Sequence, residues 1–368
     1  MTPRNHGDAP DEGLGEGELG PLEVHSEGSI VNPALSGTMR PVRGEFGRLE
    51  NVEGAEVWET ADPQEALPDG FASEADEARP YVKPKGLTAQ MFKVFIQNRV
   101  AVVFFILLVA ITLFSFVGPL FYHTNQTDLA ALQQVPNNLP PGAGHPLGTD
   151  FQGFDMLGRL MVGGRNSLIV GFLAAGMAMI IGVGYGVFSG YNGGRIDDFL
   201  MRILDVLLSI PGLFLVLAAI SLFGRNTSMM ILVIGLTGWY GVARLLRSEA
   251  LTLREREYAQ AVRSMGGKSR RIIWRHIIPN SISTTVTLAT FAIGDSILAL
   301  AALGFLGFGI QTPSTDWGTI LNNGYIALQL NYWWELWPAT ILFLIVVMSF
   351  NYIGDALRDA LEVRLRER

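Results

Sequence analysis

A short run in the middle of the chain has the residue types of a phosphate-binding site. Gly267, Lys268 and Ser269 match the end of the pattern GxxxxGK[ST], in which backbone amides and a lysine hold phosphate oxygens. The pattern also needs an earlier glycine, at the position that Val262 occupies here, and a preceding strand, which the sequence does not predict. The sequence therefore does not predict a nucleotide site in this chain.

The other residue types that perform catalysis or hold metals are sparse. The chain has no cysteine, which excludes disulfides, thiolate nucleophiles and Cys-ligated metals. His276 has neither a second histidine one helical turn further on nor a nearby cysteine, so it does not indicate a metal site. The HExxH and GxSxG patterns of metalloproteases and serine hydrolases are absent from the sequence. We therefore predict that the chain is not itself catalytic and holds no metal or cofactor.

One carboxylate stands apart because of its surroundings. Asp295 is the one acid near the middle of a long apolar run, where an unpaired charge is expensive. Two interpretations stay open: Asp295 lines a pathway through the protein, or it is neutral or paired with a polar group of another subunit.

These residues lie in a chain with the composition of a membrane protein. Hydrophobic residues make up 49% and charged residues 17% of the 368 residues, against about 25% charged in soluble domains. A helix needs about 20 apolar residues to cross about 30 Å of hydrocarbon. Six runs fit or approach this length, so we predict an all-α polytopic membrane protein with six spans. The predicted spans are 100–120, 167–190, 203–223, 229–243, 282–309 and 334–352.

Two details inside these runs bear on packing. Gly186 and Gly190 form a GxxxG spacing in the second span, which would let another helix approach closely. The third span carries Asp205 near its start and Pro211 inside it, and we predict a structural role for Asp205.

Basic residues predict how the spans are oriented. Lys and Arg cluster before the first span, between the fourth and fifth spans, and after the sixth. Six alternating spans put these three clusters on one side, which the positive-inside rule identifies as the cytoplasm, with both termini. The opposite side receives residues 121–166 and an aromatic-rich loop near 310–333, whose Trp317, Trp333, Trp334 and Trp337 suit an interfacial belt.

The first 80 residues differ from the rest. They hold 18 acidic residues against five arginines, a net charge of −13, whereas the remainder carries +6. Residues rich in Gly, Pro, Glu and Asp cannot bury enough apolar surface to fold, so we predict that 1–80 is a disordered acidic cytoplasmic tail. It is either a solvated extension or a partner-binding tail. Residues 81–99 then form a cytoplasmic juxtamembrane segment, and 100–368 the six-span domain.

A basic segment between the fourth and fifth spans, Arg254–Asn280, has helical periodicity in two parts. In the first part Tyr258, Ala261, Val262 and Met265 share an apolar face. Gly266 and Gly267 end this helix, because glycine readily takes the left-handed conformation. A second helix follows and is predicted to stop at Pro279. The segment is either an interfacial helix on anionic headgroups or a site where another protein docks.

Four motifs in this order resemble the permease subunits of ABC importers, in particular the C-type permeases of dipeptide, oligopeptide and nickel transporters. The basic segment keeps the alanine, glycine and proline spacing of their cytoplasmic loop at Ala261, Gly266 and Pro279. HPLGTDFQGFD (145–155) is similar to the segment before their second span, LGFLGFGIQTPSTDWG (303–318) to the one after their fifth, and FNYIGDALRDALEVRLR (350–366) to their C-terminal end. The resemblance covers 87–368 and has no counterpart for residues 1–80.

The resemblance implies a fold, a function and partners. The fold is that of type I ABC-importer permeases, and this subunit would form half of a peptide pathway in the inner membrane of a bacterium. The partners are a second, homologous permease, two ATP-binding subunits that hold ATP and Mg, and an extracytoplasmic binding protein; no nucleic acid is implied. Residues 244–280 form the cytoplasmic coupling loop, whose expected ATPase contacts and hinge positions are Glu257, Tyr258, Gln260, Ala261, Val262, Arg263, Met265, Gly266 and Pro279. His145, Gly148, Asp150 and Asp155 would either face the binding protein or pack against the partner permease.

Several positions depart from the pattern of the family. Gln260 and Val262 replace the Glu and the second Ala of its signature, Phe154 an arginine, Gly158 a common serine, and Leu300 a common glutamate. The sequence does not specify which peptide or other solute is carried. An ion-coupled secondary transporter and a non-transporting membrane scaffold remain the alternative functions.

Overall fold

The computed structural model describes residues 94–125, 127–130 and 135–366. By its internal contacts the chain divides into Met1–Val82 and Lys83–Arg368, and the described residues all belong to the second unit. The predictions for residues 1–80 and for most of 81–99 therefore lie outside the described residues. Within these residues the fold is helical, with two isolated β-bridges in the loop before the second span.

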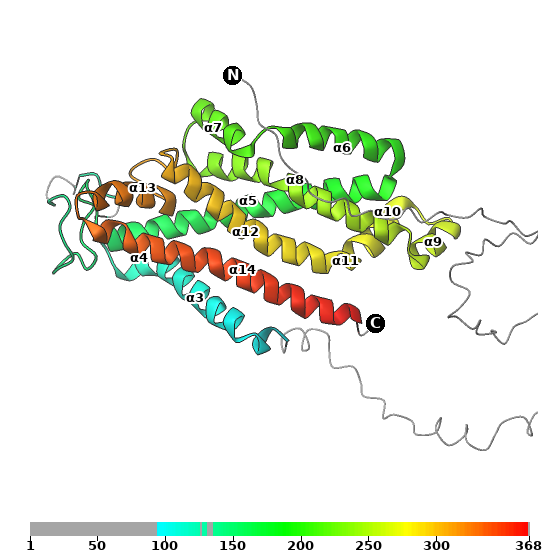
Figure 1. The fold of residues 1–368 in the computed structure, drawn as a ribbon, viewed down its shortest axis with the longest axis horizontal. Coiled ribbons are helices and arrows are strands. Elements are labelled where there is room, and N and C mark those ends of the chain that lie inside the picture. Colours follow the sequence, from blue (N-terminus) through cyan, green and yellow to red (C-terminus); the bar gives the residue numbers. More distant parts are fainter. Residues whose placement is uncertain (1–93, 126, 131–134, 367–368) are drawn as a thin grey trace, which may run out of the picture. The chain divides into compact units, whose positions relative to one another are not determined.

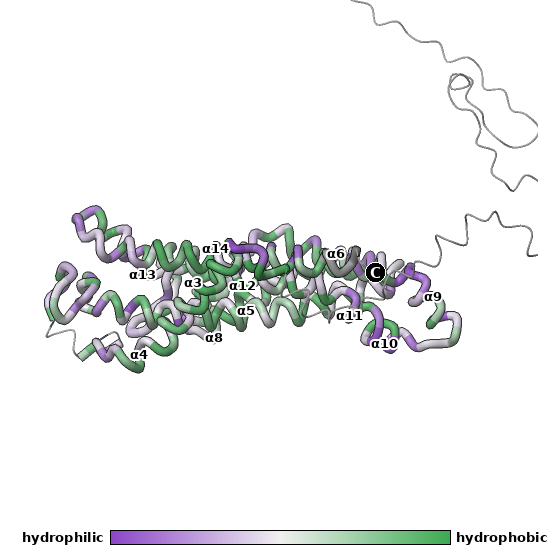
Figure 2. Tube along the Cα trace, turned by 90° about the horizontal axis from the view of Figure 1, so that it is seen from below, coloured by the Kyte–Doolittle hydropathy of each residue, from purple (hydrophilic) through white to green (hydrophobic). Residues whose placement is uncertain are grey.

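Among the described residues, five helices are long and apolar enough to cross a membrane. They lie side by side in Figure 1, and Figure 2 shows their apolar middle parts between more polar ends. Five of the six predicted spans are thus confirmed, but three of these helices run further than their apolar cores because polar residues continue the helix beyond the hydrocarbon. The five are α3 (Arg99–Phe116), α5 (Met156–Asn192), α8 (Thr227–Arg254), α12 (Ile282–Phe305) and α14 (Trp337–Arg366).

The third predicted span is a broken pair of helices. Helices α6 (Gly194–Ser209) and α7 (Gly212–Phe223) meet at an angle of 75°. Pro211 lies at the break, where its ring and missing amide hydrogen prevent a continuous helix. The prediction of one straight helix over 203–223 is wrong in this respect. With this bent pair counted as one span, the described residues contain six.

Helices α5 and α8 pack with their backbones in close contact. A side chain at Gly186 would collide with the carbonyl oxygen of Ala243, and one at Gly190 with the carbonyl oxygen of Arg247. The close approach predicted from the GxxxG spacing is therefore confirmed, and its partner is α8.

The region between α12 and α14 is a packed helix where the sequence predicted a loop. Helix α13 (Trp317–Leu328) lies at the end of the bundle beside α12 (Figure 1). Trp317 is fully buried and Trp334 nearly so, whereas Trp333 and Trp337 are about half exposed. The interfacial belt therefore excludes Trp317 and Trp334, which fill the core. Sequence composition could not separate these two roles, because both use tryptophan.

Candidate functional site

Helix α9 (Glu257–Ser264) is the first part of the basic segment, and it is anchored by one narrow side. Ala259 is 3% exposed and Val262 is half-buried, and both join a cluster with Tyr191, Leu246 and Ile277. The predicted helix is confirmed, but its inward side runs through Ala259, which the sequence prediction did not single out. Val262, predicted to lie on the outer apolar face, turns towards the cluster.

The outer side of α9 is largely exposed, although the ring of Tyr258 stacks on that of His276, with 5.9 Å between their centres. Met265 is 78% and Tyr258 37% exposed, and Ala261 lies exposed between them on the same side. The predicted polar contacts Glu257, Gln260 and Arg263 are also exposed. We call Tyr258, Ala261 and Met265 the outer face of α9; it offers an apolar patch with polar neighbours.

Glycines close α9 as predicted. Gly266 has a φ of 77°, the left-handed conformation that a side chain disfavours. The Gly267 amide donates to the Val262 carbonyl oxygen at 2.9 Å, which satisfies a carbonyl left open by the helix end. The backbone therefore reverses after one short helix.

The second part of the basic segment continues almost into α12. It consists of α10 (Ser269–Ile272), a π-helical turn (Ile273–Ile277) and α11 (Ile278–Asn280). Pro279 lies within α11, whose last residue is Asn280, so the second part ends one residue after the predicted stop and just before α12. Only Ser281 separates α11 from α12.

Ion pairs that the sequence did not predict hold the start of the basic segment. Arg247 of α8 donates two hydrogen bonds to Asp197 of α6, at 2.6 and 2.5 Å, and Asp197 also accepts from Ser189 of α5. Arg254 donates to the Gly190 carbonyl oxygen at 3.2 Å. Asp205 pairs with Arg244, but both side chains are more than half exposed. The C-terminal end of α8 is thus tied to α5 and α6 before α9 begins.

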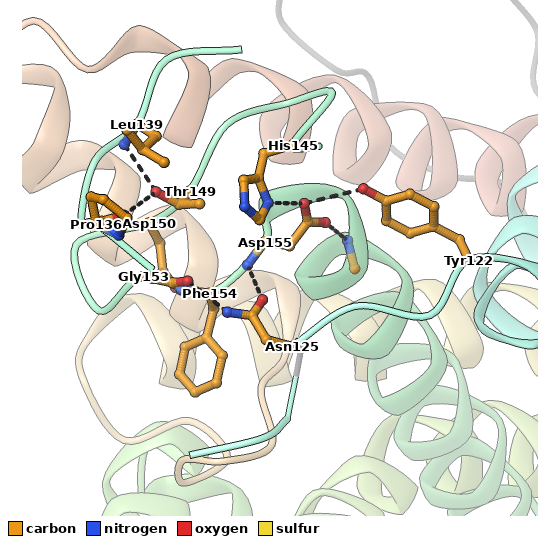
Figure 3. Close-up of polar contacts among 11 residues, drawn as sticks. Tyr122, Asn125, Pro136, Leu139, His145, Thr149, Asp150, Gly153, Phe154 and Asp155 are labelled. Carbon is orange, nitrogen blue, oxygen red and sulfur yellow. Dashed lines mark hydrogen bonds and ion pairs between the residues drawn. The ribbon is translucent and has the colours of Figure 1, made fainter. Parts of the chain in front are cut away.

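At the other end of the bundle, the motif 145–155 forms a loop that is held by internal hydrogen bonds directly before α5 (Figure 3). Asp155 caps α5 by accepting the Gly158 amide at 2.8 Å, and its other oxygen lies 2.8 Å from Nδ1 of His145. The hydroxyl of Tyr122 donates to the same oxygen at 3.2 Å. Burial, together with the nearby Asp155 charge, raises the pKa of Tyr122 to about 12. Asp155 has no exposed surface, so all its partners are internal.

Asp150 organises the turn before Asp155. One oxygen accepts the amides of Gln152 and Phe154, each at 2.9 Å, and the other lies 3.9 Å from Nε of Arg159. Burial raises the pKa of Asp150, although the guanidinium of Arg159 opposes the rise. The guanidinium of Arg159 also lies 4.4 Å from the ring centre of the fully buried Phe154. Phe154 thus fills the position of the family's arginine with an aromatic surface for Arg159.

Gly148 is required where it lies. Its φ is 76°, and a side chain would collide with the carbonyl oxygen of Leu139 and with the ring of Trp334. Of the four residues predicted to face a partner, Gly148, Asp150 and Asp155 are buried, and only His145 is partly exposed, at 23% of its side chain. These buried residues therefore stabilise the conformation of the loop itself.

The motif 303–318 folds against the same end of α5. Asp316 caps α13 by accepting the amide of Thr319 at 3.0 Å, and its second oxygen accepts the amide of Ile310 at 2.8 Å. Burial raises the pKa of this carboxyl. Asn166 of α5 donates to the Thr315 carbonyl oxygen at 2.7 Å. These contacts join the start of α5 to the end of α12.

Asp295 lies apart from both ends of the bundle. It is exposed on α12 and lines a cavity of about 430 Å³ with residues of α5, α7 and α8. Polar neighbours in this cavity are Thr237 and Ser296, and no basic residue lines it. The described residues contain no group of three or more His, Asp or Glu side chains that could bind a metal ion.

Comparisons with known proteins agree on the type of chain. Residues 182–367 match the family described as binding-protein-dependent transport system inner membrane component, and residues 86–141 match the N-terminal TM domain of oligopeptide transport permease C. The dipeptide transport system permease protein DppC of Bacillus subtilis is 35% identical over 270 residues, 73% of this chain and 83% of that protein. The oligopeptide transport system permease protein OppC of Escherichia coli K12 is 37% identical over 274 residues, 74% of this chain and 89% of that protein.

Among solved structures, the MetNI methionine ABC transporter in an inward-facing conformation is similar, with a TM-score of 0.47 and 19% identity; the match covers 56% of this chain and 97% of that chain. The two family matches contain the basic segment and the motifs 303–318 and 350–366, whereas the motif 145–155 lies between them. The chain is therefore a permease subunit and belongs to the inner membrane components of binding-protein-dependent transport systems, in the group of oligopeptide transport permease C.

Proposed function

We propose that this chain is one of two permease subunits of an ATP-driven importer of dipeptides or oligopeptides, and that it forms half of the pathway. The observation that carries the proposal is the exposed outer face of α9 on a helix anchored by Ala259 and by the Arg247–Asp197 pair. An anchored helix with an exposed apolar face can transmit the movement of a partner to the spans. The printed functions of the relatives supply the substrate class of the proposal.

The two ends of the bundle would bind different partners. Tyr258, Ala261 and Met265 would enter an apolar cleft of an ATP-binding subunit, with Glu257, Gln260 and Arg263 as polar contacts at its rim. ATP and Mg would be held by two such subunits and not by this chain. His145 marks the side that would meet an extracytoplasmic binding protein, and a second permease would complete the pathway beside Asp295.

The basic residues support the orientation of the proposal. The ion pairs of Arg244, Arg247 and Arg254 and the unpaired arginines of the basic segment all lie at the end of the bundle that carries α9. This end would be cytoplasmic, together with both termini, in the inner membrane of a bacterium.

The test is substrate-stimulated ATP hydrolysis in proteoliposomes by this chain assembled with a second permease, two ATPase subunits and a binding protein. Ala261→Arg places a charge on the exposed outer face, so the subunit should still insert while stimulated hydrolysis and peptide uptake fall at least about tenfold. Gly266→Val imposes backbone strain on the turn and should lower stimulated hydrolysis and peptide uptake in the same way.

The matched control is Ala259→Arg, on the same helix. Ala259 is buried, so this change should reduce the yield of folded subunit itself. Normal uptake by a variant with both Ala261→Arg and Gly266→Val would refute the coupling role. Uptake by this chain alone, driven by an ion gradient, would overturn the importer proposal in favour of a secondary transporter.

A further inference from the structure

An apolar groove runs along the part of α5 nearest the basic segment. Its volume is about 690 Å³. One wall consists of Ile180, Val183, Gly184 and Phe188 of α5, and the other includes Ile273 and Ile278 of the basic segment. Ile180 is 78% and Phe188 51% exposed, so the groove is open along its length. An open groove on a membrane-spanning helix is filled by something apolar, because water there would contact mainly hydrocarbon groups.

A cationic hollow adjoins this groove at one end. It is lined by Lys268, Arg270, Arg271 and Arg275, together with Trp274 and Pro279. Arg270 and Trp274 line both the groove and the hollow. No carboxylate lines either of them, and none of the four basic residues forms an ion pair with another described residue. Trp274 is 66% exposed at the junction.

We propose that an anionic phospholipid binds here, with an acyl chain in the groove along α5 and its phosphate at Arg270 and the neighbouring cations. The arrangement matches the layers of a membrane: hydrocarbon beside the span, an amphipathic tryptophan at the boundary, and cations at headgroup depth. A helix of a protein partner would fill the groove equally well, but it would leave the uncompensated cations without a counter-charge. Charge complementarity therefore selects the lipid.

The bound lipid would add a second connection between two parts that already pack together through Val187 and Tyr191 of α5 and Ile277. Its acyl chain contacts α5, and its headgroup contacts the π-helical turn and α10, which follow α9. The inference goes beyond the proposed function and does not require it, since lipid retention can be measured without transport.

Two glycines of α5 provide a matched test. A side chain added at Gly184 points into open space within the groove, and one added at Gly176, two turns earlier, points into open space outside it. Gly184→Leu therefore fills the groove without a clash inside the chain, and Gly176→Leu adds the same volume to the same helix elsewhere.

The experiment uses the assembled importer, purified from bilayers that contain equal amounts of phosphatidylglycerol and phosphatidylcholine, with retained lipids counted by native mass spectrometry. The unmodified protein and Gly176→Leu should retain phosphatidylglycerol over phosphatidylcholine by at least about tenfold. Gly184→Leu should lose this retention, and a variant with Arg270→Gln and Arg271→Gln should retain both lipids equally.

Three outcomes would overturn the proposal. One is equal retention of the two lipids by the unmodified protein, and another is unchanged retention in Gly184→Leu. The third is an importer without bound lipid in which Gly184→Leu reduces recovery of the second permease, since the groove would then be a protein interface.

Discussion

The motif 145–155 and the outer face of α9 are both family motifs, yet they use their residues in opposite ways. Asp155 has no exposed surface, and each of its carboxylate oxygens accepts from groups of the same chain. Met265 is 78% exposed and lies with the exposed Ala261 and with Tyr258, whose ring stacks on His276 but which is still 37% exposed. A motif whose polar groups are satisfied internally builds the fold, whereas a motif that leaves an apolar face open is suited to a partner.

The largest effect on stability is expected at Gly148. Gly148→Ala adds a side chain where φ is 76° and where the Leu139 carbonyl oxygen and the Trp334 ring leave no room, so the free energy of unfolding should fall by about 3 kcal/mol. Thermal unfolding of the purified subunit measures the loss.

Gly144 is the matched control, since its φ is 89° but no atom lies near an added side chain. Gly144→Ala should therefore cost only the backbone strain, about 1 kcal/mol. Equal losses in the two variants would show that the loop yields, and the distinction drawn between the two motifs would weaken.

An intermediate effect is expected where the α9 end is anchored. Asp197 and Asp205 both pair α6 with α8, but the Asp197 side chain is 6% exposed and that of Asp205 63%. Asp197→Asn leaves Arg247 without its counter-charge and should lower the free energy of unfolding by about 2 kcal/mol. Asp205→Asn should change it by less than about 0.5 kcal/mol. Similar values for the two variants in thermal unfolding would mean that the buried pair is not the anchor.

The smallest effect on stability is expected on the outer face of α9. Met265→Asp should leave the free energy of unfolding within about 0.5 kcal/mol of the unmodified protein, because the side chain is exposed. Stimulated ATP hydrolysis should nevertheless fall at least about tenfold, since the carboxylate would be buried against the ATPase. Ser264→Asp adds the same charge one residue away on the polar side and should have a weaker effect. A stability loss with Met265→Asp would place this side chain in the fold and remove the contrast with the motif 145–155.

The sequence predicted the spans well because their signal is local. An apolar run of about 20 residues is sufficient to identify a span, and the GxxxG spacing identified the close helix contact. The break at Pro211 was missed, since a proline inside an apolar run is compatible with a kink as well as with a break. The burial of Trp317 was also missed, because its depth depends on α5, 150 residues earlier in the chain.

The candidate site was predicted in outline for the same reason. Helical periodicity located α9 and the glycine turn. It did not identify the side of α9 that packs inward, because Tyr258, Ala261, Val262 and Met265 form one apolar face and Ala259 lies outside it. Packing against Tyr191 and Leu246 decides it, and neither residue is near in sequence. The Arg247–Asp197 pair joins residues 50 positions apart, so only the folded chain brings it together.

The close contact of α5 and α8 has a mechanical consequence. Helix α8 has 28 residues and is about 42 Å long. Gly186 and Gly190 let the two backbones touch, so the pair can tilt as a rigid rod but cannot easily slide apart. A tilt of about 10° about one end would displace Arg254 at the other by about 7 Å, given the rise of an α-helix. A small rotation of the α5–α8 pair near the motif 145–155 would thus move α9, at the other end of the pair, by several ångströms.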